Sequence, residues 1–161
     1  MTSVKNAIMI KTLEARECIE ILNNNYIGHL AFISQKEPFV IPITYYYDQA
    51  NNTIIGYSAE GHKIKAMREN VIVSLQVEEV TSVNKWRSVR AQGTFEELQG
   101  IDAKYLLHEF AQNVKKLVAE KEGSHPEFIS EFSSKLYEQG LPIVYRINIH
   151  EISGKYRDSS K

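Results

Sequence analysis

The stretch Tyr57-Ser58-Ala59-Glu60-Gly61-His62-Lys63 decides the fold class, because a strand pattern ends in it and a short helix pattern begins. Residues 53–58 are predicted as a strand and residues 62–70 as a helix. A small hydroxyl, a glycine, a lysine and the first amides of the helix converge there. Because helix N-termini leave N–H groups unpaired and carry partial positive charge, the stretch predicts a seat for a phosphate group. The alternative is a solvated Lys63 and a Ser58 without a ligand.

A second cluster, Trp86-Arg87-Ser88-Val89, lies on a later predicted strand. Arg87 and Ser88 point to opposite faces of that strand, so both meet one ligand only where it wraps the strand's end or edge. The alternative assigns Arg87 to a cross-strand salt bridge and Ser88 to packing. Trp86 is predicted to pack in the protein or to cover a ligand.

Short turns join most of the predicted strands, which indicates antiparallel pairing in a curled sheet. The predicted strands are residues 26–34, 39–47, 53–58, 71–78, 86–97 and 143–152, and the predicted helices are residues 12–24, 62–70, 102–120 and about 124–140. Pro42 predicts an edge strand or a bulge, and Gly93 predicts a bend. Thr12 is the predicted cap of the first helix, and a polar tail is predicted after Gly154. We therefore predict an α+β, mainly β fold: a six-stranded antiparallel split β-barrel with flanking helices, in one domain over residues 1–161.

The composition is that of an ordinary globular protein, with 43% apolar and 24% charged residues and a net charge of −1. This balance gives no broad basic surface for nucleic acid. Cys18 is the only cysteine and no histidine stands at metal-ligand spacing, so neither an intrachain disulfide nor a metal site is predicted. No apolar run reaches the roughly 20 residues of a membrane helix, and the start does not have the pattern of a signal peptide. We therefore expect a cytoplasmic protein without membrane contact.

The run Tyr45-Tyr46-Tyr47 raises the question of nucleic-acid stacking. Strand alternation sends Tyr45 and Tyr47 to one face and Tyr46 to the other, which favours packing. The same strand is expected to supply an apolar rim for a dimer.

Five stretches, in this order, give the chain a resemblance to a known family. They are Gly28-His29-Leu30-Ala31-Phe32, Pro38–Tyr46, Tyr57–Lys63, Trp86-Arg87-Ser88-Val89 with Gly93 behind it, and Gly154-Lys155. On these stretches the chain resembles the pyridoxamine 5′-phosphate oxidase-like FMN-binding split barrels, in the nitroimidazole-resistance reductase-like branch, over about residues 13–155. The resemblance implies a homodimer with FMN bound in two clefts between the subunits.

The resemblance also implies which residues hold the cofactor. Ser58 and Lys63 would hold the FMN phosphate, with His62 nearby. Arg87 and Ser88 would reach the phosphate and the flavin edge. The isoalloxazine ring would lie beside the strand that contains Pro42, Ile43 and Thr44. Relatives in the branch often have histidine where this chain has Tyr57. True pyridoxamine-phosphate oxidases carry a further arginine-serine motif, distinct from Arg87-Ser88, that binds the substrate phosphate, and an Arg-Leu-x-Pro ending. This chain has neither, so vitamin B6 oxidation is not expected.

The expected function is an FMN-dependent, nitroreductase-like oxidoreductase that takes electrons from a nicotinamide donor and passes them to a small acceptor. No catalytic residue is predicted, because hydride transfer on a flavin needs no acid or base from the protein. One alternative is a protein that holds FMN, a deazaflavin or haem without turnover, with His29, His62 or His150 as the only candidate axial ligands. Another is a structural or interaction domain with an empty cleft.

Overall fold

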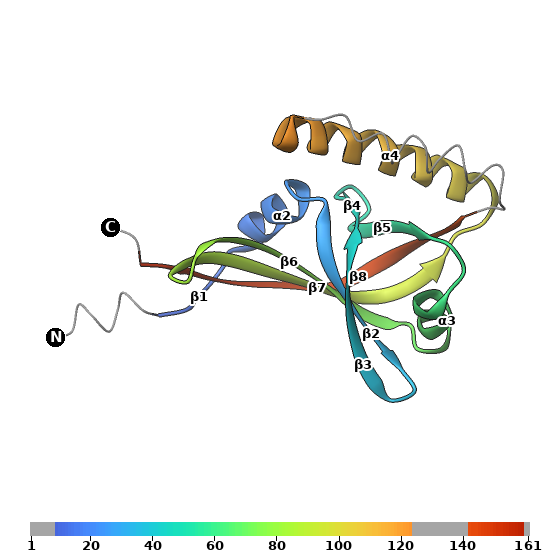
Figure 1. The fold of residues 1–161 in the computed structure, drawn as a ribbon, viewed down its shortest axis with the longest axis horizontal. Helices are drawn as coiled ribbons and strands as arrows, with labels where there is room; N and C mark the ends of the chain where they lie inside the picture. The colour runs from blue at the N-terminus through green and yellow to red at the C-terminus, as the bar shows by residue number, and fades with distance from the viewer. Residues whose placement is uncertain (1–8, 124–141, 160–161) are drawn as a thin grey trace.

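The computed structural model describes residues 9–123 and 142–159 as one antiparallel sheet with three helices (Figure 1). The strands are β1 (Lys11–Thr12), β2 (Ile27–Ser34), β3 (Glu37–Thr44), β4 (Tyr46–Asp48), β5 (Thr53–Ser58), β6 (Ile72–Ser82), β7 (Lys85–Glu97) and β8 (Ile143–Asp158). The helices are α2 (Ala15–Asn23), α3 (His62–Glu69) and α4 (Gly100–Glu122). The strand order is β3-β2-β6-β7-β8-β5-β4, with β1 paired to β8. The predicted class, α+β and mainly β with a split-barrel sheet, is confirmed.

Two short strands raise the strand number from the predicted six to eight. The predicted strand 39–47 is divided at Tyr45, whose N–H donates to the carbonyl of Tyr26, and β4 beyond it pairs with β5. Thr12 lies in β1 and does not cap the first helix. That helix begins at Ala15, with Glu14 at the N-cap position and no side-chain cap.

The predicted polar tail after Gly154 was wrong, because β8 continues as a strand to Asp158. Lys155 and Tyr156 pair with β7 on one side and with β1 on the other. Hydrogen bonding along both edges holds this segment extended although its side chains are mostly polar. The predicted helix at residues 124–140 lies outside the described residues.

The core lies on the inner face of the curled sheet. β2, β6 and β7 contribute alternate residues to it, and the fully buried members of the core include Leu30, Leu75, Val89 and Ile147. Tyr45 and Tyr47 are buried in this core, whereas Tyr46 packs in a second cluster beneath α4, so the predicted packing role is confirmed. The exposed apolar side chains of this strand are Phe39 at 36% and Val40 at 65%, whereas Tyr45 and Tyr47 are only 0% and 5% exposed.

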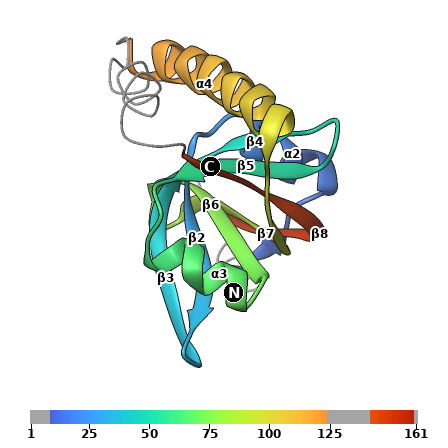
Figure 2. The ribbon, with the colours of Figure 1, turned by 90° about the vertical axis from the view of Figure 1, so that its right-hand side faces the viewer.

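The helices cover parts of the sheet but leave one face open. α4 lies over β4, β5 and β8, where Phe110, Val114 and Val118 pack on the sheet (Figure 2). α3 packs against β2 and buries Ile64 and Met67 in the main core. The outer face of β3, β2, β6 and β7 carries exposed apolar side chains, including Val40, Ile72 and Val80.

Two sequence signals for irregular strands are confirmed. β3 ends the sheet, so Pro42 lies on an edge strand, where a missing N–H costs nothing to the ladder. The β7–β8 pairing shifts register between Gln92 and Gly93. A Cβ atom on Gly93 would lie 2.2 Å from the carbonyl oxygen of Asn148, so the close approach at this bulge requires glycine.

Candidate functional site

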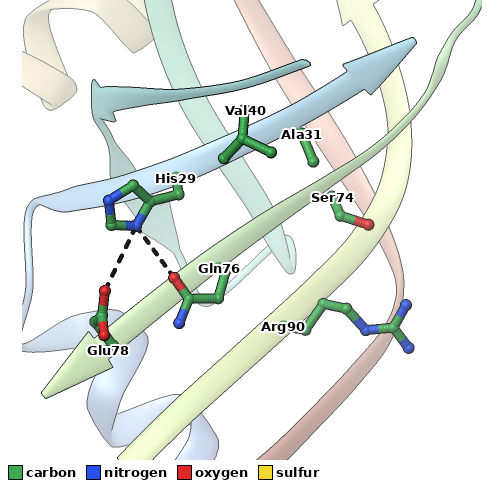
Figure 3. A pocket seen from close by; sticks show the side chains of 7 residues that line it. All are labelled: His29, Ala31, Val40, Ser74, Gln76, Glu78 and Arg90. Carbon is green, nitrogen blue, oxygen red and sulfur yellow. Dashed lines mark hydrogen bonds and ion pairs between the residues drawn. The ribbon is translucent and has the colours of Figure 1, made fainter. Parts of the chain in front are cut away.

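The outer face of the sheet contains a pocket of about 420 Å³, which we call the open-face pocket (Figure 3). Its lining comes from four neighbouring strands and comprises His29, Ala31, Val40, Ser74, Gln76, Glu78 and Arg90. Strand alternation explains this set, because the residues between them, such as Leu30, Leu75 and Val89, point into the core. The pocket is therefore built from the outer face of strands whose inner face packs in the core.

A short chain of hydrogen bonds crosses this face and reaches Ser88. Nδ1 of His29 lies 3.1 Å from Oε1 of Gln76 and 3.9 Å from Oε1 of Glu78 (Figure 3). Nε2 of Gln76 donates to Oγ of Ser88 at 2.9 Å. Ser88, a predicted flavin contact, is paired with Glu78 in the β6–β7 ladder and thus shares the face of the open-face pocket.

Arg87 lies on the opposite face of β7, as strand alternation predicts. Its guanidinium donates to the carboxylate of Glu79, which also accepts a hydrogen bond from Asn25. Burial alone would raise the pKa of Glu79, but the hydrogen bonds from Arg87 and Asn25 hold it below its usual value. The structure therefore gives Arg87 the cross-strand salt bridge of the alternative interpretation and does not bring it together with Ser88.

The predicted phosphate-binding stretch is a strand end followed by a helix start. Ser58 ends β5 and its hydroxyl donates to the carbonyl of Ala59, while α3 begins at His62. Nε2 of His62 lies 3.0 Å from Oγ of Ser34, and its ring meets the ring of Phe39 edge-on, so His62 faces the β2–β3 hairpin. Ser58 and Lys63 are thus held close together by the chain, and His62 points toward a different element.

Lys63 is partly buried at the start of α3. Among the described residues, none forms a hydrogen bond or an ion pair with its ammonium group, and burial lowers its pKa below the usual 10.5. The N-cap residue, Gly61, supplies no side-chain hydrogen bond, and the first intrahelical bond runs from the N–H of Lys65 to the carbonyl of Gly61. The amides before Lys65 and the ammonium group are therefore available to an anion.

The third predicted group lies on the edge strand. The side chain of Pro42 is exposed on the outer face, opposite His29 in the ladder, whereas Ile43 is 8% exposed and belongs to the core. Thr44 is partly buried at the end of β3. The backbone groups of Ile43 face Gly28 in the β2–β3 ladder, so the free edge of β3 presents the backbone groups of Pro42 and Thr44 instead.

Within one chain, the phosphate-binding stretch and Ser88 lie at opposite ends of β8 (Figure 1). Ser58 pairs with Ile143 and Ser88 pairs with Lys155, so twelve residues of β8 separate the two pairs. At about 3.3 Å per residue this is roughly 40 Å of strand. One copy of the chain does not bring the two groups into a single site.

The sequence matches one family over most of its length. A family model described as pyridoxamine 5′-phosphate oxidase matches residues 14–156. The chain belongs to this family. The resemblance inferred from the sequence is thereby confirmed at the level of the pyridoxamine 5′-phosphate oxidase family, whose name describes the family and not the reaction of this member.

The chain is also similar to individual proteins and to solved structures. An uncharacterized protein of Rhizobium meliloti (strain 1021) is 32% identical over 91 residues, which is 56% of this chain and 59% of the relative's length. The crystal structure of a FAD-binding protein from Mesorhizobium loti is 29% identical, with a TM-score of 0.69 over 92% of this chain and 96% of that one. A putative 5-nitroimidazole antibiotic resistance protein from Bacteroides thetaiotaomicron is 15% identical, with a TM-score of 0.64 over 92% and 89% of the two chains. The last likeness supports the fold alone.

Two properties of the described part of the chain bear on the kind of site. In residues 9–123 and 142–159, no three histidine, cysteine, aspartate or glutamate side chains gather closely enough to hold a metal ion. None of the described helices is sufficiently long and apolar to span a membrane.

Sequence reasoning did not single out the lining of the open-face pocket. In the sequence, His29 stands in one of the resemblance stretches and is a candidate haem ligand, whereas Gln76, Glu78 and Arg90 are not candidate site residues. Alternation along β6 and β7 places Gln76, Glu78 and Arg90 on the polar face, but only the register of the sheet sets Gln76 beside His29.

Proposed function

We propose that this protein binds FMN in clefts completed by a second copy of the chain and acts as an oxidoreductase. The electrons would come from a nicotinamide donor and pass to a small acceptor. Membership of the pyridoxamine 5′-phosphate oxidase family and likeness to a FAD-binding protein support a flavin cofactor. The observation that carries the proposal is the partly buried Lys63, which lacks a partner among the described residues.

A phosphate group would provide hydrogen-bond acceptors for the Lys63 ammonium and for the uncapped backbone amides at the start of α3. An ammonium that loses water without gaining a carboxylate is costly to keep charged, and burial accordingly lowers the pKa of Lys63. A phosphate ester beside it would accept charge-assisted hydrogen bonds from the ammonium and from the uncapped helix amides. FMN carries a terminal phosphate of this kind, so its phosphate end fits the Ser58–Lys63 stretch.

A second copy of the chain would bring Ser88 to the same ligand. Ser88 lies about 40 Å along β8 from the Ser58–Lys63 stretch, so a site that contains both needs two chains. The outer face around Ser88 also exposes Val40 by 65%, Val80 by 61% and Ile72 by 49%, and a partner would remove this apolar surface from water. These two features support a homodimer.

The bound flavin would supply the two-electron chemistry, and the residues of this chain would bind and orient it. Lys63 and the α3 amides would hold the phosphate end. The free edge of β3 at Pro42–Thr44 would present backbone groups to the ring edge, and Ser88 from the partner would contact the ring from the other side. No described residue is needed as an acid or base, because the shape of the cleft and the ring position decide what can react.

The first test is the visible absorption spectrum of the purified protein, followed by heat release and chromatography of any chromophore. Release of FMN supports the proposal, while a Soret band assigns a haem protein instead. Protein that is colourless and does not take up added FMN refutes it. Oxidation of NADH or NADPH over a panel of nitro, quinone and other small acceptors then separates an enzyme from a protein that only holds the cofactor. Sizing chromatography at micromolar concentration tests the dimer, and a monomer contradicts the shared site.

A further inference from the structure

We propose that His29 and Gln76 position the Ser88 hydroxyl so that it donates its proton to an acceptor atom of the ligand in the open-face pocket. The inference rests on the proposed function, which places a flavin beside Ser88. Ser88 contacts the ligand, whereas His29 and Gln76 act through it as positioning residues. Two hydrogen bonds link these residues, one between His29 and Gln76 (Figure 3) and one between Gln76 and Ser88, and their directions decide whether Ser88 can donate.

Glu78 fixes the direction at the first step. A carboxylate is an acceptor only, and Oε1 of Glu78 lies 3.9 Å from Nδ1 of His29. The tautomer with its proton on Nδ1 is favoured by this negative charge, since a lone pair at Nδ1 would face the carboxylate without a proton between them. The second oxygen near Nδ1, Oε1 of Gln76 at 3.1 Å, therefore accepts from it.

The direction at Gln76 follows from the geometry of an amide. A glutamine side chain has one acceptor oxygen and one donor nitrogen, so turning the oxygen to His29 turns the NH2 group to Ser88. Nε2 of Gln76 lies 2.9 Å from Oγ of Ser88, as this orientation requires. With the proton on Nδ1 of His29, the opposite orientation would set this N–H donor against the NH2 group of Gln76, which is also a donor.

The hydroxyl of Ser88 is therefore left with a proton to give. Its oxygen accepts from Gln76, and among the described residues none accepts a hydrogen bond from it. Arg90 on the same face adds a guanidinium, which can only donate. The outer face thus offers donors at Arg90 in the open-face pocket and at Ser88 beside it, and it fits a ring carbonyl oxygen or an unprotonated ring nitrogen of a flavin better than a ring N–H.

The hydrogen-bond direction can be measured without any ligand. Nitrogen-15 shifts of the His29 imidazole in the unliganded protein distinguish a proton on Nδ1 from a proton on Nε2. We expect Nδ1 to carry it in the wild type. A neutral His29 with its proton on Nε2 would overturn the proposal regardless of whether FMN binds.

The second measurement is the Kd for FMN in Ser88→Ala and Gln76→Glu variants. Ser88→Ala removes the donor, and we expect about tenfold weaker binding, the value of one ordinary hydrogen bond. Gln76→Glu replaces the NH2 group by an acceptor that draws the Ser88 proton inward, so we expect a similar loss. Because both changes remove the same bond, the double variant should bind no more than about twofold more weakly than Ser88→Ala alone.

Matched controls separate this effect from charge and from general damage. Gln112→Glu adds the same charge at an exposed position of α4, and Ser82→Ala removes an exposed hydroxyl at the end of β6; neither residue lines the open-face pocket. We expect both controls to keep the wild-type Kd within about twofold, and thermal melting checks that each variant folds.

If wild-type protein binds FMN, and the Ser88→Ala and Gln76→Glu variants bind it as tightly as wild type, the positioning role is refuted while the proposed function stands. If wild-type protein does not bind FMN, the proposed function is refuted and so is the flavin as the ligand of this pocket. The nitrogen-15 shifts of His29 then still test the direction of the hydrogen bonds, because they are measured without a ligand.

Discussion

Replacing Lys63 by methionine should stabilise the empty protein and weaken FMN binding. Methionine keeps the length and the apolar stem of the side chain but removes an ammonium that is partly buried without a partner among the described residues. We expect a gain in unfolding free energy of about 0.5–1 kcal/mol, a small value because the group retains contact with water. Loss of a charge-assisted bond to phosphate should cost about 1.5–3 kcal/mol, or roughly 10- to 150-fold in Kd.

Higher stability of the empty protein together with weaker FMN binding is the result expected for a binding residue. Two assays on the same variant measure these two quantities. Urea unfolding of the flavin-free protein gives the stability, and quenching of flavin fluorescence gives the Kd. Lys65→Met is the control, because Lys65 lies on the same helix with its side chain exposed. Wild-type affinity in Lys63→Met would contradict our assignment of the phosphate site, and a loss of stability would contradict the desolvation argument.

The stabilisation by Lys63→Met should also depend on pH in a defined direction. The folded protein lowers the pKa of Lys63 from the usual 10.5, so the unfolded chain binds more protons between the two pKa values. Wild-type stability therefore rises relative to that of the variant as pH increases through the folded pKa toward 10.5. The advantage of methionine is complete below the folded pKa and should fade above it, which urea unfolding at neutral pH and at about pH 10 can measure.

Two further predictions concern the fold. Gly93→Ala should destabilise the protein by more than about 2 kcal/mol, because the new Cβ would meet the main-chain oxygen of Asn148. Urea unfolding should show this loss. The control Gly61→Ala should show no comparable loss, because nothing lies within 4 Å of a Cβ atom at that position. Tyr45→Phe should cost about 1–2 kcal/mol by the same measurement, since the buried hydroxyl donates to the carbonyl of Leu22 at 2.8 Å and its loss leaves that acceptor unpaired; a variant as stable as wild type would show that water replaces the hydroxyl.

The sequence predicted those parts of the fold that local patterns determine. Alternation along residues 71–78 and 86–97 located β6 and β7, and Pro42 and Gly93 marked an edge and a bulge. β1 and the last part of β8 were missed, because their polar side chains carry no alternating pattern and pairing between distant segments holds them as strands. Thr12 was predicted as a helix cap because nothing in the neighbouring sequence indicates its pairing with Lys155 of β8.

The candidate site was predictable in its pieces but not in its assembly. The Ser58–Lys63 stretch is local in sequence, and alternation alone separated Arg87 from Ser88. The neighbours of Ser88 could not be found this way, because His29 and Gln76 meet only through the register of β2 with β6. His62 was placed beside the phosphate by resemblance, whereas in the structure it bonds to Ser34 across the helix–hairpin contact.

The length of β8 has a consequence for mixtures of defective proteins. One chain carries the Ser58–Lys63 stretch at one end of this strand and Ser88 at the other. In the proposed dimer, each chain therefore supplies Lys63 to one site and Ser88 to the other site. A chain defective at Lys63, paired with a chain defective at Ser88, would concentrate both faults in one site and leave the other intact. Equal mixing of the two proteins with free exchange of subunits should therefore restore about a quarter of the wild-type sites. Two genes, each encoding an inactive protein, could in this way complement one another in the same cell.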